Sequence, residues 1–132
     1  MAMTAIRPSP IVRASPAQLA TYFEAKLAAE LGPHNVKRLL DAGSRDLVLL
    51  DVRSREGYTA GHLPGAIHIP FEALATRAKE LPKSKDIICY CWDVTCILST
   101  KAAYVLAKRG YRTKELLGGI AAWQHAGFPI EQ

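Results

Sequence analysis

Residues 47–52 read Leu-Val-Leu-Leu-Asp-Val, and this short run indicates the fold class. Apart from Asp51 it is apolar, without the alternation of a strand that has one wet face, so it predicts a strand covered on both faces of a parallel sheet. Further strands are predicted at 66–69, 86–91 and 113–117, and residues 11–14 are a candidate edge strand.

Helical segments alternate with these strands. A helix is predicted to begin at Pro16, where Ser15 and Gln18 form a capping box, and to continue to Gly32-Pro33. Further helices are predicted at 35–42, 71–79, 97–109 and 120–126. Strands that alternate with helices predict right-handed βαβ units in an α/β fold, with ligands bound beyond the carboxyl ends of the strands.

Length and composition indicate one globular domain. The chain has 132 residues and a mass of 14.4 kDa, which is too small for two ordinary domains. We expect a flexible tail at 1–10 and a folded domain at 11–130, with a helical extension at about 16–42. No apolar run is long enough to span a bilayer and the start lacks a secretory signal, so we expect a cytoplasmic protein with no membrane partner.

Positive charge is in excess but is not concentrated. The formal net charge is +5, and no aromatic residues are interleaved with the basic ones at a spacing suited to nucleic acid. We therefore expect no nucleic-acid partner, and a surface that attracts small anions as a secondary effect.

The three cysteines, Cys89, Cys91 and Cys96, lie within eight residues. An odd cluster of this kind is no disulfide framework and indicates metal, redox or nucleophilic chemistry. Zinc is disfavoured because the spacing lacks a Cys-x-x-Cys pair and no histidine is near in the sequence. We expect no metal and no organic cofactor.

Cys91 is the candidate nucleophile because it ends a predicted strand and a loop leads from it into a helix. Backbone N–H groups and the positive end of the helix dipole stabilise a thiolate at such a place. Cys89 points to the same face one step back and is expected to pack in the core. For Cys96 two interpretations are open: a resolving thiol that faces Cys91 across the loop, or an anchor for the first helical turn.

Several stretches together resemble the rhodanese-like domain family of single-domain sulfurtransferases, over about residues 11–130. The resemblance implies a three-layer α/β sandwich with a five-stranded, mostly parallel sheet flanked by helices. The stretches are Asp51-Val52-Arg53 with Glu56 and Tyr58; Gly61-His62-Leu63-Pro64-Gly65-Ala66-Ile67-His68-Ile69-Pro70; Tyr90-Cys91 with Lys101-Ala102-Ala103; and Gly118-Gly119 with Trp123, Gly127 and Pro129.

The resemblance also implies a reaction. A Cys91 thiolate would attack the outer sulfur of a small anionic donor such as thiosulfate, and the resulting persulfide would pass to a thiol or to cyanide. The N–H groups of the binding loop, residues Trp92, Asp93, Val94, Thr95 and Cys96, would stabilise its charge. Four residues near the site are expected to be structural, in buried polar pairs: Asp51, Arg53, Glu56 and His62.

The loop departs from the commonest family pattern. Eight residues, 92–99, separate Cys91 from Thr100, where six are usual, and they include no arginine or lysine. The Asp93 carboxylate would repel an anionic donor. The pattern Cys-Trp-x-x-x-Cys resembles a long-loop bacterial subgroup, and Trp92 is expected either to line the pocket or to shield the loop from water.

Two alternatives to sulfur transfer stay open. One is a thiol–disulfide switch formed by Cys91 and Cys96, and the other is a binding module that kept the fold without activity. A phosphatase is excluded because position 97 is Ile, where phosphate chemistry needs the bidentate grip of an arginine. The sequence leaves the oligomeric state open.

Overall fold

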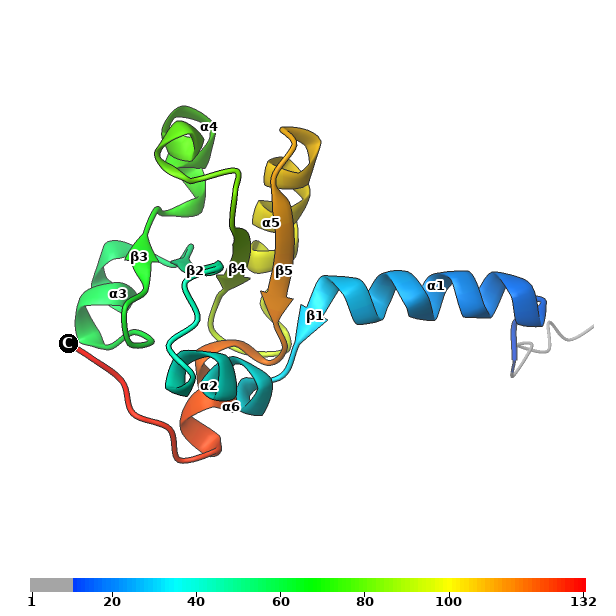
Figure 1. Ribbon diagram of the computed structural model, residues 1–132, viewed down its shortest axis with the longest axis horizontal. Coiled ribbons are helices and arrows are strands. Elements are labelled where there is room, and N and C mark those ends of the chain that lie inside the picture. The colour runs from blue at the N-terminus through cyan, green and yellow to red at the C-terminus, as the bar shows by residue number, and fades with distance from the viewer. Residues whose placement is uncertain (1–10) are drawn as a thin grey trace, which may run out of the picture.

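The computed structural model describes residues 11–132 and contains one five-stranded sheet (Figure 1). The strand order is β1-β5-β4-β2-β3, and all neighbouring strands are parallel. The strands are β1 Glu30–Leu31, β2 Leu47–Asp51, β3 Ile67–His68, β4 Asp86–Tyr90 and β5 Arg112–Leu116. The predicted α/β class with a five-stranded parallel sheet is therefore confirmed.

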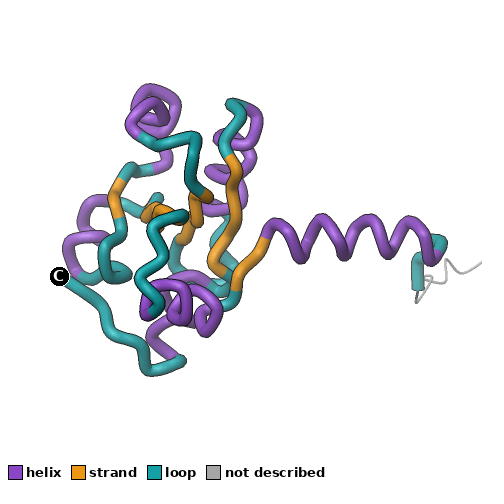
Figure 2. Tube along the Cα trace, in the orientation of Figure 1, coloured by secondary structure: helices purple, strands orange, loops and turns teal. Residues whose placement is uncertain are grey.

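The helices alternate with the strands along the chain. They are α1 Pro16–Ala29, α2 Pro33–Asp41, α3 Arg55–Ala60, α4 Leu74–Arg77, α5 Leu98–Lys108 and α6 Gly119–His125, with 3-10 turns η1 Phe71–Ala73 and η2 Ala78–Glu80 on either side of α4. The predicted helices at 35–42, 97–109 and 120–126 correspond to α2, α5 and α6. The one predicted at 71–79 is the mixed segment η1-α4-η2. Helices surround the central strands (Figure 2).

Side chains of the two central strands, β2 and β4, alternate between two separate cores. Leu50 and Cys89 pack with the α5 residue Leu106 on one face of the sheet. Leu49 and Ile88 pack with residues of α2 and α6 on the other face. The continuous apolar runs therefore exist because each strand is covered on both faces, and the result is the expected three-layer arrangement.

Two predictions for the N-terminal region are wrong: the helix does not reach Gly32, and the edge strand does not lie at 11–14. The helix expected to reach Gly32 ends at Ala29, because Leu31 packs against the core beside α2 and α6 and Glu30 adopts an extended backbone. Residues 30–31 pair in parallel with β5, so the predicted extension is not helical throughout. Residues 11–14 form no strand, since α1 carries them away from the sheet (Figure 1). The tail predicted at 1–10 lies outside the described residues.

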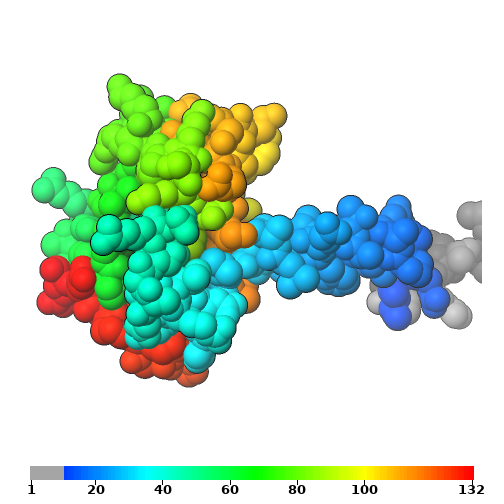
Figure 3. Space-filling model, in the orientation of Figure 1, coloured from blue at the N-terminus to red at the C-terminus, as the bar shows by residue number. Residues whose placement is uncertain are grey.

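Helix α1 extends from the rest of the structure as an arm (Figure 3). It begins as predicted, with Ser15 and Gln18 forming the capping box. None of its residues is buried. At its C-terminal end the ammonium of Lys114 donates a hydrogen bond to the carbonyl of Ala28. The apolar residues spaced along this helix are therefore exposed instead of covering the core.

Helix α3 was not predicted from the sequence. It forms because Ser54 caps it, accepting a hydrogen bond from the N–H of Gly57 at 3.2 Å, and because Glu56 in its first turn complements the helix dipole. Among residues 11–132, no helix is both long and apolar enough to cross a bilayer.

Candidate active site

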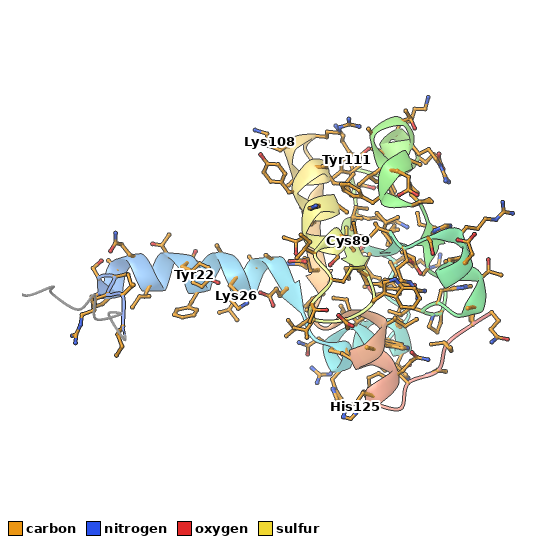
Figure 4. The ribbon with its side chains drawn as sticks, turned by 180° about the vertical axis from the view of Figure 1, so that it is seen from behind. Tyr22, Lys26, Cys89, Lys108, Tyr111 and His125 are labelled. Atoms are coloured by element: carbon orange, nitrogen blue, oxygen red, sulfur yellow. A yellow bond between two sulfur atoms is a disulfide. The ribbon has the colours of Figure 1, made fainter. Side chains whose placement is uncertain are left out.

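Two of the three cysteines lie on one face of the sheet. Cys91 directly follows β4 and is 1% exposed, and Cys89 is fully buried in the same core cluster. Figure 4 shows Cys89 in the middle of the structure, far from the arm that carries Tyr22 and Lys26. Burial raises the pKa of the Cys89 thiol to about 12, so it is protonated at neutral pH. The expectation that Cys89 packs in the core is confirmed.

The loop after Cys91 is exposed and is shaped by Asp93. The Asp93 carboxylate accepts hydrogen bonds from the N–H of Thr95 at 2.9 Å and from its hydroxyl at 2.6 Å. The N–H of Cys96 donates to the carbonyl of Asp93 at 3.1 Å. These bonds hold the pKa of Asp93 below its usual value, so the carboxylate is ionised at neutral pH. Val94 lies at the tip of the loop, 79% exposed.

The loop brings Cys96 back to Cys91. The two residues form a disulfide, with their Cα atoms 6.3 Å apart. Two interpretations were open for Cys96. The disulfide agrees with the one in which Cys96 faces Cys91 across the loop. Cys96 is half-buried, and α5 begins two residues later at Leu98.

The start of α6 supports the reactive segment from behind. The N–H of Ile120 donates to the carbonyl of Cys91 at 3.0 Å, and that of Ala121 donates to Trp92 at 2.9 Å. Gly119 has φ +61°, and a Cβ added there would lie 2.6 Å from the Cys91 carbonyl oxygen. Glycine is needed at this position because any side chain would push α6 away from Cys91.

Trp92 lies against α3 and the β2 end of the site. The Arg53 guanidinium carbon is 4.4 Å from the centre of the indole ring. A Cβ added to Gly57 would come within 2.8 Å of the same ring. The ring shields Arg53 from water, and it also lines a pocket of about 140 Å³ with residues that include Ile120 and Gln124. Trp92 therefore lines a pocket, and the group that it shields is Arg53 and not the loop.

Asp51 and Arg53 form a buried ion pair at the end of β2. Their exposed fractions are 0% and 1%. Arg53 Nη2 lies 2.7 Å from Asp51 Oδ2, and Arg53 Nε lies 3.1 Å from both carboxylate oxygens. Arg53 Nη2 also donates to the carbonyl of Gly61 at 2.6 Å. Each charge thus has a partner, as burial requires.

His62 completes this polar region. Its Nδ1 lies 2.9 Å from the Tyr58 carbonyl oxygen, and its ring stacks on the Tyr58 ring with 3.8 Å between centroids. Its Nε2 is 3.7 Å from the Glu131 carboxylate. Asp51, Arg53 and His62 are therefore buried and paired.

The expectation for Glu56 is wrong. Its side chain is exposed, and it has no hydrogen-bond or ion-pair partner within residues 11–132. The reason is its place in the first turn of α3, whose buried side is occupied by Gly57. Glu56 faces solvent there and complements the helix dipole, so it does not belong to the buried pair beside it.

A polar pocket of about 190 Å³ opens beside Cys96. Residues from the loop, the start of α5 and the ends of β5 and β1 line it. In its wall, the Glu115 carboxylate accepts hydrogen bonds from the hydroxyls of Ser99 at 3.1 Å and Thr100 at 2.6 Å. Glu115 was not among the predicted site residues. The available signal was its place near the carboxyl end of β5, which pairs with β4 in parallel and so ends at the same edge.

The remaining titratable residues offer no metal site. Within the described part of the chain, no group of three or more His, Cys, Asp or Glu side chains is placed to hold a metal ion. His68 Nε2 lies 2.7 Å from the Arg53 carbonyl oxygen, and His34 packs edge-on against Phe128.

Comparison with known proteins agrees with this architecture. The chain matches the rhodanese-like domain over residues 32–126, and it belongs to that family. The match begins after α1 and β1, so it is shorter than the expected 11–130.

The relatives include sulfurtransferases. The chain is 34% identical to a sulfurtransferase of Allochromatium vinosum, over 67% of this chain and 82% of the relative. It is 39% identical to an HTH-type transcriptional regulator of Mycobacterium tuberculosis, over 66% of this chain but only 38% of the regulator. The crystal structure of the BH2092 protein from Bacillus halodurans superposes with a TM-score of 0.81 at 35% identity, over 89% of this chain and 86% of that one. The matching domain and the sulfurtransferase relative support an enzyme of the rhodanese-like family.

Proposed function

We propose that the protein is a sulfurtransferase that carries sulfane sulfur as a persulfide on Cys91. The donor is thiosulfate or a similar small anion, and the acceptor is a thiol or cyanide. The observation that carries the proposal is the place of Cys91: it directly follows the central strand β4, and only six residues separate it from the N-terminus of α5. The long loop with Trp92 and Cys96 supports including the Cys-Trp-x-x-x-Cys subgroup in this proposal.

The reaction has two displacements at sulfur. The Cys91 thiolate attacks the outer sulfur of thiosulfate; a new S–S bond forms, the S–S bond of thiosulfate breaks, and sulfite leaves with the electron pair. The acceptor, a thiolate or cyanide, then attacks the outer sulfur of the persulfide. The Cys91 thiolate leaves, and the acceptor departs as a persulfide or as thiocyanate.

The loop supplies donors for the persulfide charge. Among the described residues, the N–H groups of Trp92, Asp93 and Val94 have no hydrogen-bond acceptor, whereas those of Thr95 and Cys96 are bonded to Asp93. The first three groups are therefore free to donate to an anion at Cys91, and the positive end of the α5 dipole adds to the same field.

Reduction has to precede sulfur transfer, because a disulfide-bonded Cys91 has no thiolate. We therefore propose a cytoplasmic setting, where thiol reductants keep such pairs reduced. The Cys91–Cys96 disulfide also favours a second candidate function, a thiol–disulfide switch. In such a switch, oxidation of Cys91 to the disulfide would require Cys96, and neither cysteine would take up sulfur from a donor.

Intact mass of the reduced protein after brief exposure to thiosulfate tests the proposal. The Cys96→Ser variant, which lacks the second thiol, is expected to gain the mass of one sulfur atom and to release sulfite. Cys91→Ser is expected to gain none, and its thiocyanate formation should fall by about 1000-fold or more. Cys89→Ala is the control with both loop cysteines intact. Uptake retained by Cys91→Ser, or absent from Cys96→Ser, would overturn the proposal.

A further inference from the structure

We propose that Cys96 resolves the Cys91 persulfide, so that the cysteine pair reduces sulfane sulfur to hydrosulfide and ends each turnover as the Cys91–Cys96 disulfide. This inference rests on the proposed function, because it needs the persulfide as its starting point. It adds a product, hydrosulfide, and a requirement, an external thiol reductant.

The geometry for this step exists without rearrangement of the fold. In the disulfide form β4 keeps its parallel pairing with β2 and β5, and α5 is intact from Leu98. The turn formed by Asp93 and Thr95 returns the chain so that the Cα atoms of Cys91 and Cys96 are 6.3 Å apart. Cys96 therefore reaches the inner sulfur of a Cys91 persulfide from the position it already holds.

The step balances in atoms and electrons. The Cys96 thiolate attacks Cys91 Sγ, a Cys91–Cys96 bond forms, and the bond from Cys91 Sγ to the outer sulfur breaks. The outer sulfur leaves with the electron pair and takes up the proton that Cys96 lost, as hydrosulfide. Counted from the reduced cysteine pair and the sulfane sulfur of the donor, each cysteine sulfur has lost one electron and the sulfane sulfur has gained both.

Proximity favours this internal acceptor over thiols from solution. The disulfide brings the sulfur of Cys96 into bonding contact with that of Cys91. Cys96 is held next to it, and a tethered thiol acts at an effective concentration in the millimolar range or above. Cys89 cannot substitute, because it is fully buried within the core two residues back along β4.

Regeneration begins at Cys96. The polar pocket of about 190 Å³ is lined by Cys96 and not by Cys91, so a thiolate that enters it approaches Cys96 before Cys91. Attack there forms a mixed disulfide and expels the Cys91 thiolate, the nucleophile that the next turnover needs. A second thiol of the reductant then releases Cys96, so a dithiol restores the pair and leaves as its own disulfide.

A single-turnover experiment without external thiol tests the inference. The full-length protein is reduced with dithiothreitol, freed of it under anaerobic conditions and mixed with thiosulfate. Sulfite, hydrosulfide and intact mass are measured together. The wild type is expected to release one sulfite and one hydrosulfide per chain and to end two hydrogens lighter. Cys96→Ser is expected to release sulfite alone and to keep the added sulfur, while Cys89→Ala should behave as the wild type.

The outcomes separate this inference from the proposed function. Stable sulfur on the wild type without hydrosulfide would overturn the resolving role of Cys96 and leave sulfur transfer intact. Disulfide formation in a parallel sample without thiosulfate, or disulfide without hydrosulfide, would also overturn it. Absence of both sulfite and added sulfur in Cys96→Ser would instead overturn the proposed function.

Discussion

The carboxyl ends of β2 and β4 are neighbours in the sheet but have opposite properties. Asp51 and Tyr90 are paired in register, so the two chain segments that follow start side by side. After β2 comes a buried ion pair whose charges are satisfied within the protein. After β4 comes an exposed loop held by the Asp93 turn and one disulfide. Trp92 joins the two, because its ring packs on Arg53.

The difference indicates how the site divides its tasks. A fully paired buried network is rigid and costly to disturb, so it holds its neighbours in position. Under the proposed function, by contrast, the loop passes between disulfide, dithiol and persulfide forms, and its exposed residues leave room for these changes. Five substitutions or measurements test this difference.

Removing the Arg53 guanidinium from the buried ion pair should have the largest effect on stability. Arg53→Met leaves the Asp51 carboxylate buried and unpaired, so we expect the free energy of unfolding to fall by about 3–5 kcal/mol in urea titrations of the reduced protein. Arg55→Met, an exposed arginine two residues away, should change it by less than about 0.5 kcal/mol. Similar losses in both variants would contradict the role assigned to the buried pair.

A methyl group at residue 119 should disturb the contact between α6 and the reactive segment. Gly119→Ala combines a left-handed backbone with a clash against the Cys91 carbonyl, and we expect a loss of about 2–3 kcal/mol in unfolding free energy together with slower sulfur uptake. Gly43→Ala is the matched control, since Gly43 has φ +70° with nothing within 4 Å of an added Cβ. It should lose only about 1–2 kcal/mol, with normal uptake.

Removing the charge of the loop should affect binding of the donor more than stability. Asp93→Asn keeps an oxygen that accepts from Thr95, so the turn survives, while the repulsion of an anion disappears. With a pair energy of roughly 1 kcal/mol or less near the surface, KM for thiosulfate should fall about three-fold in steady-state assays. Asp46→Asn, an exposed aspartate just before β2, should leave KM unchanged.

Acidification should not mimic this substitution. The folded-state pKa of Asp93 lies below its usual value, so the carboxylate stays ionised as pH falls from 8 to 5. Its hydrogen bonds stabilise the loop above about pH 4 and are lost only as pH falls through the lowered pKa. A fall in KM between pH 8 and 5 that is present in the wild type but absent from Asp93→Asn would contradict this assignment.

The smallest effect is expected at Cys89. Its pKa is raised to about 12, so the stability that the protonated thiol contributes is complete below about pH 8.5 and declines as pH rises toward 12. Iodoacetamide at pH 8 should therefore leave Cys89 unmodified in the native reduced protein, and mass mapping should find the label on Cys91 and Cys96. Labelling of Cys89 at a similar rate would contradict its burial.

Local sequence patterns were enough to predict the central strands, the Ser15 cap and the position of Cys91 after β4. Each of these depends on neighbours in sequence: a continuous apolar run, a capping box, or a strand followed by a helix. The loop length and the charge of Asp93 were equally readable, because they are properties of a few consecutive residues.

The other features depend on contacts between distant segments. A two-residue strand is too short to show a periodic pattern of apolar residues. Strand β1 is therefore recognised only from the pairing of Glu30 and Leu31 with β5. The spacing of apolar residues in α1 predicts a helix but not what covers it, and the folded chain leaves it uncovered. Glu56 is exposed because of the direction in which α3 runs, and Glu115 reaches the site because β5 lies beside β4. The pairing of Cys96 with Cys91 likewise needed a distance between Cα atoms, which spacing along a chain does not specify and the folded loop does.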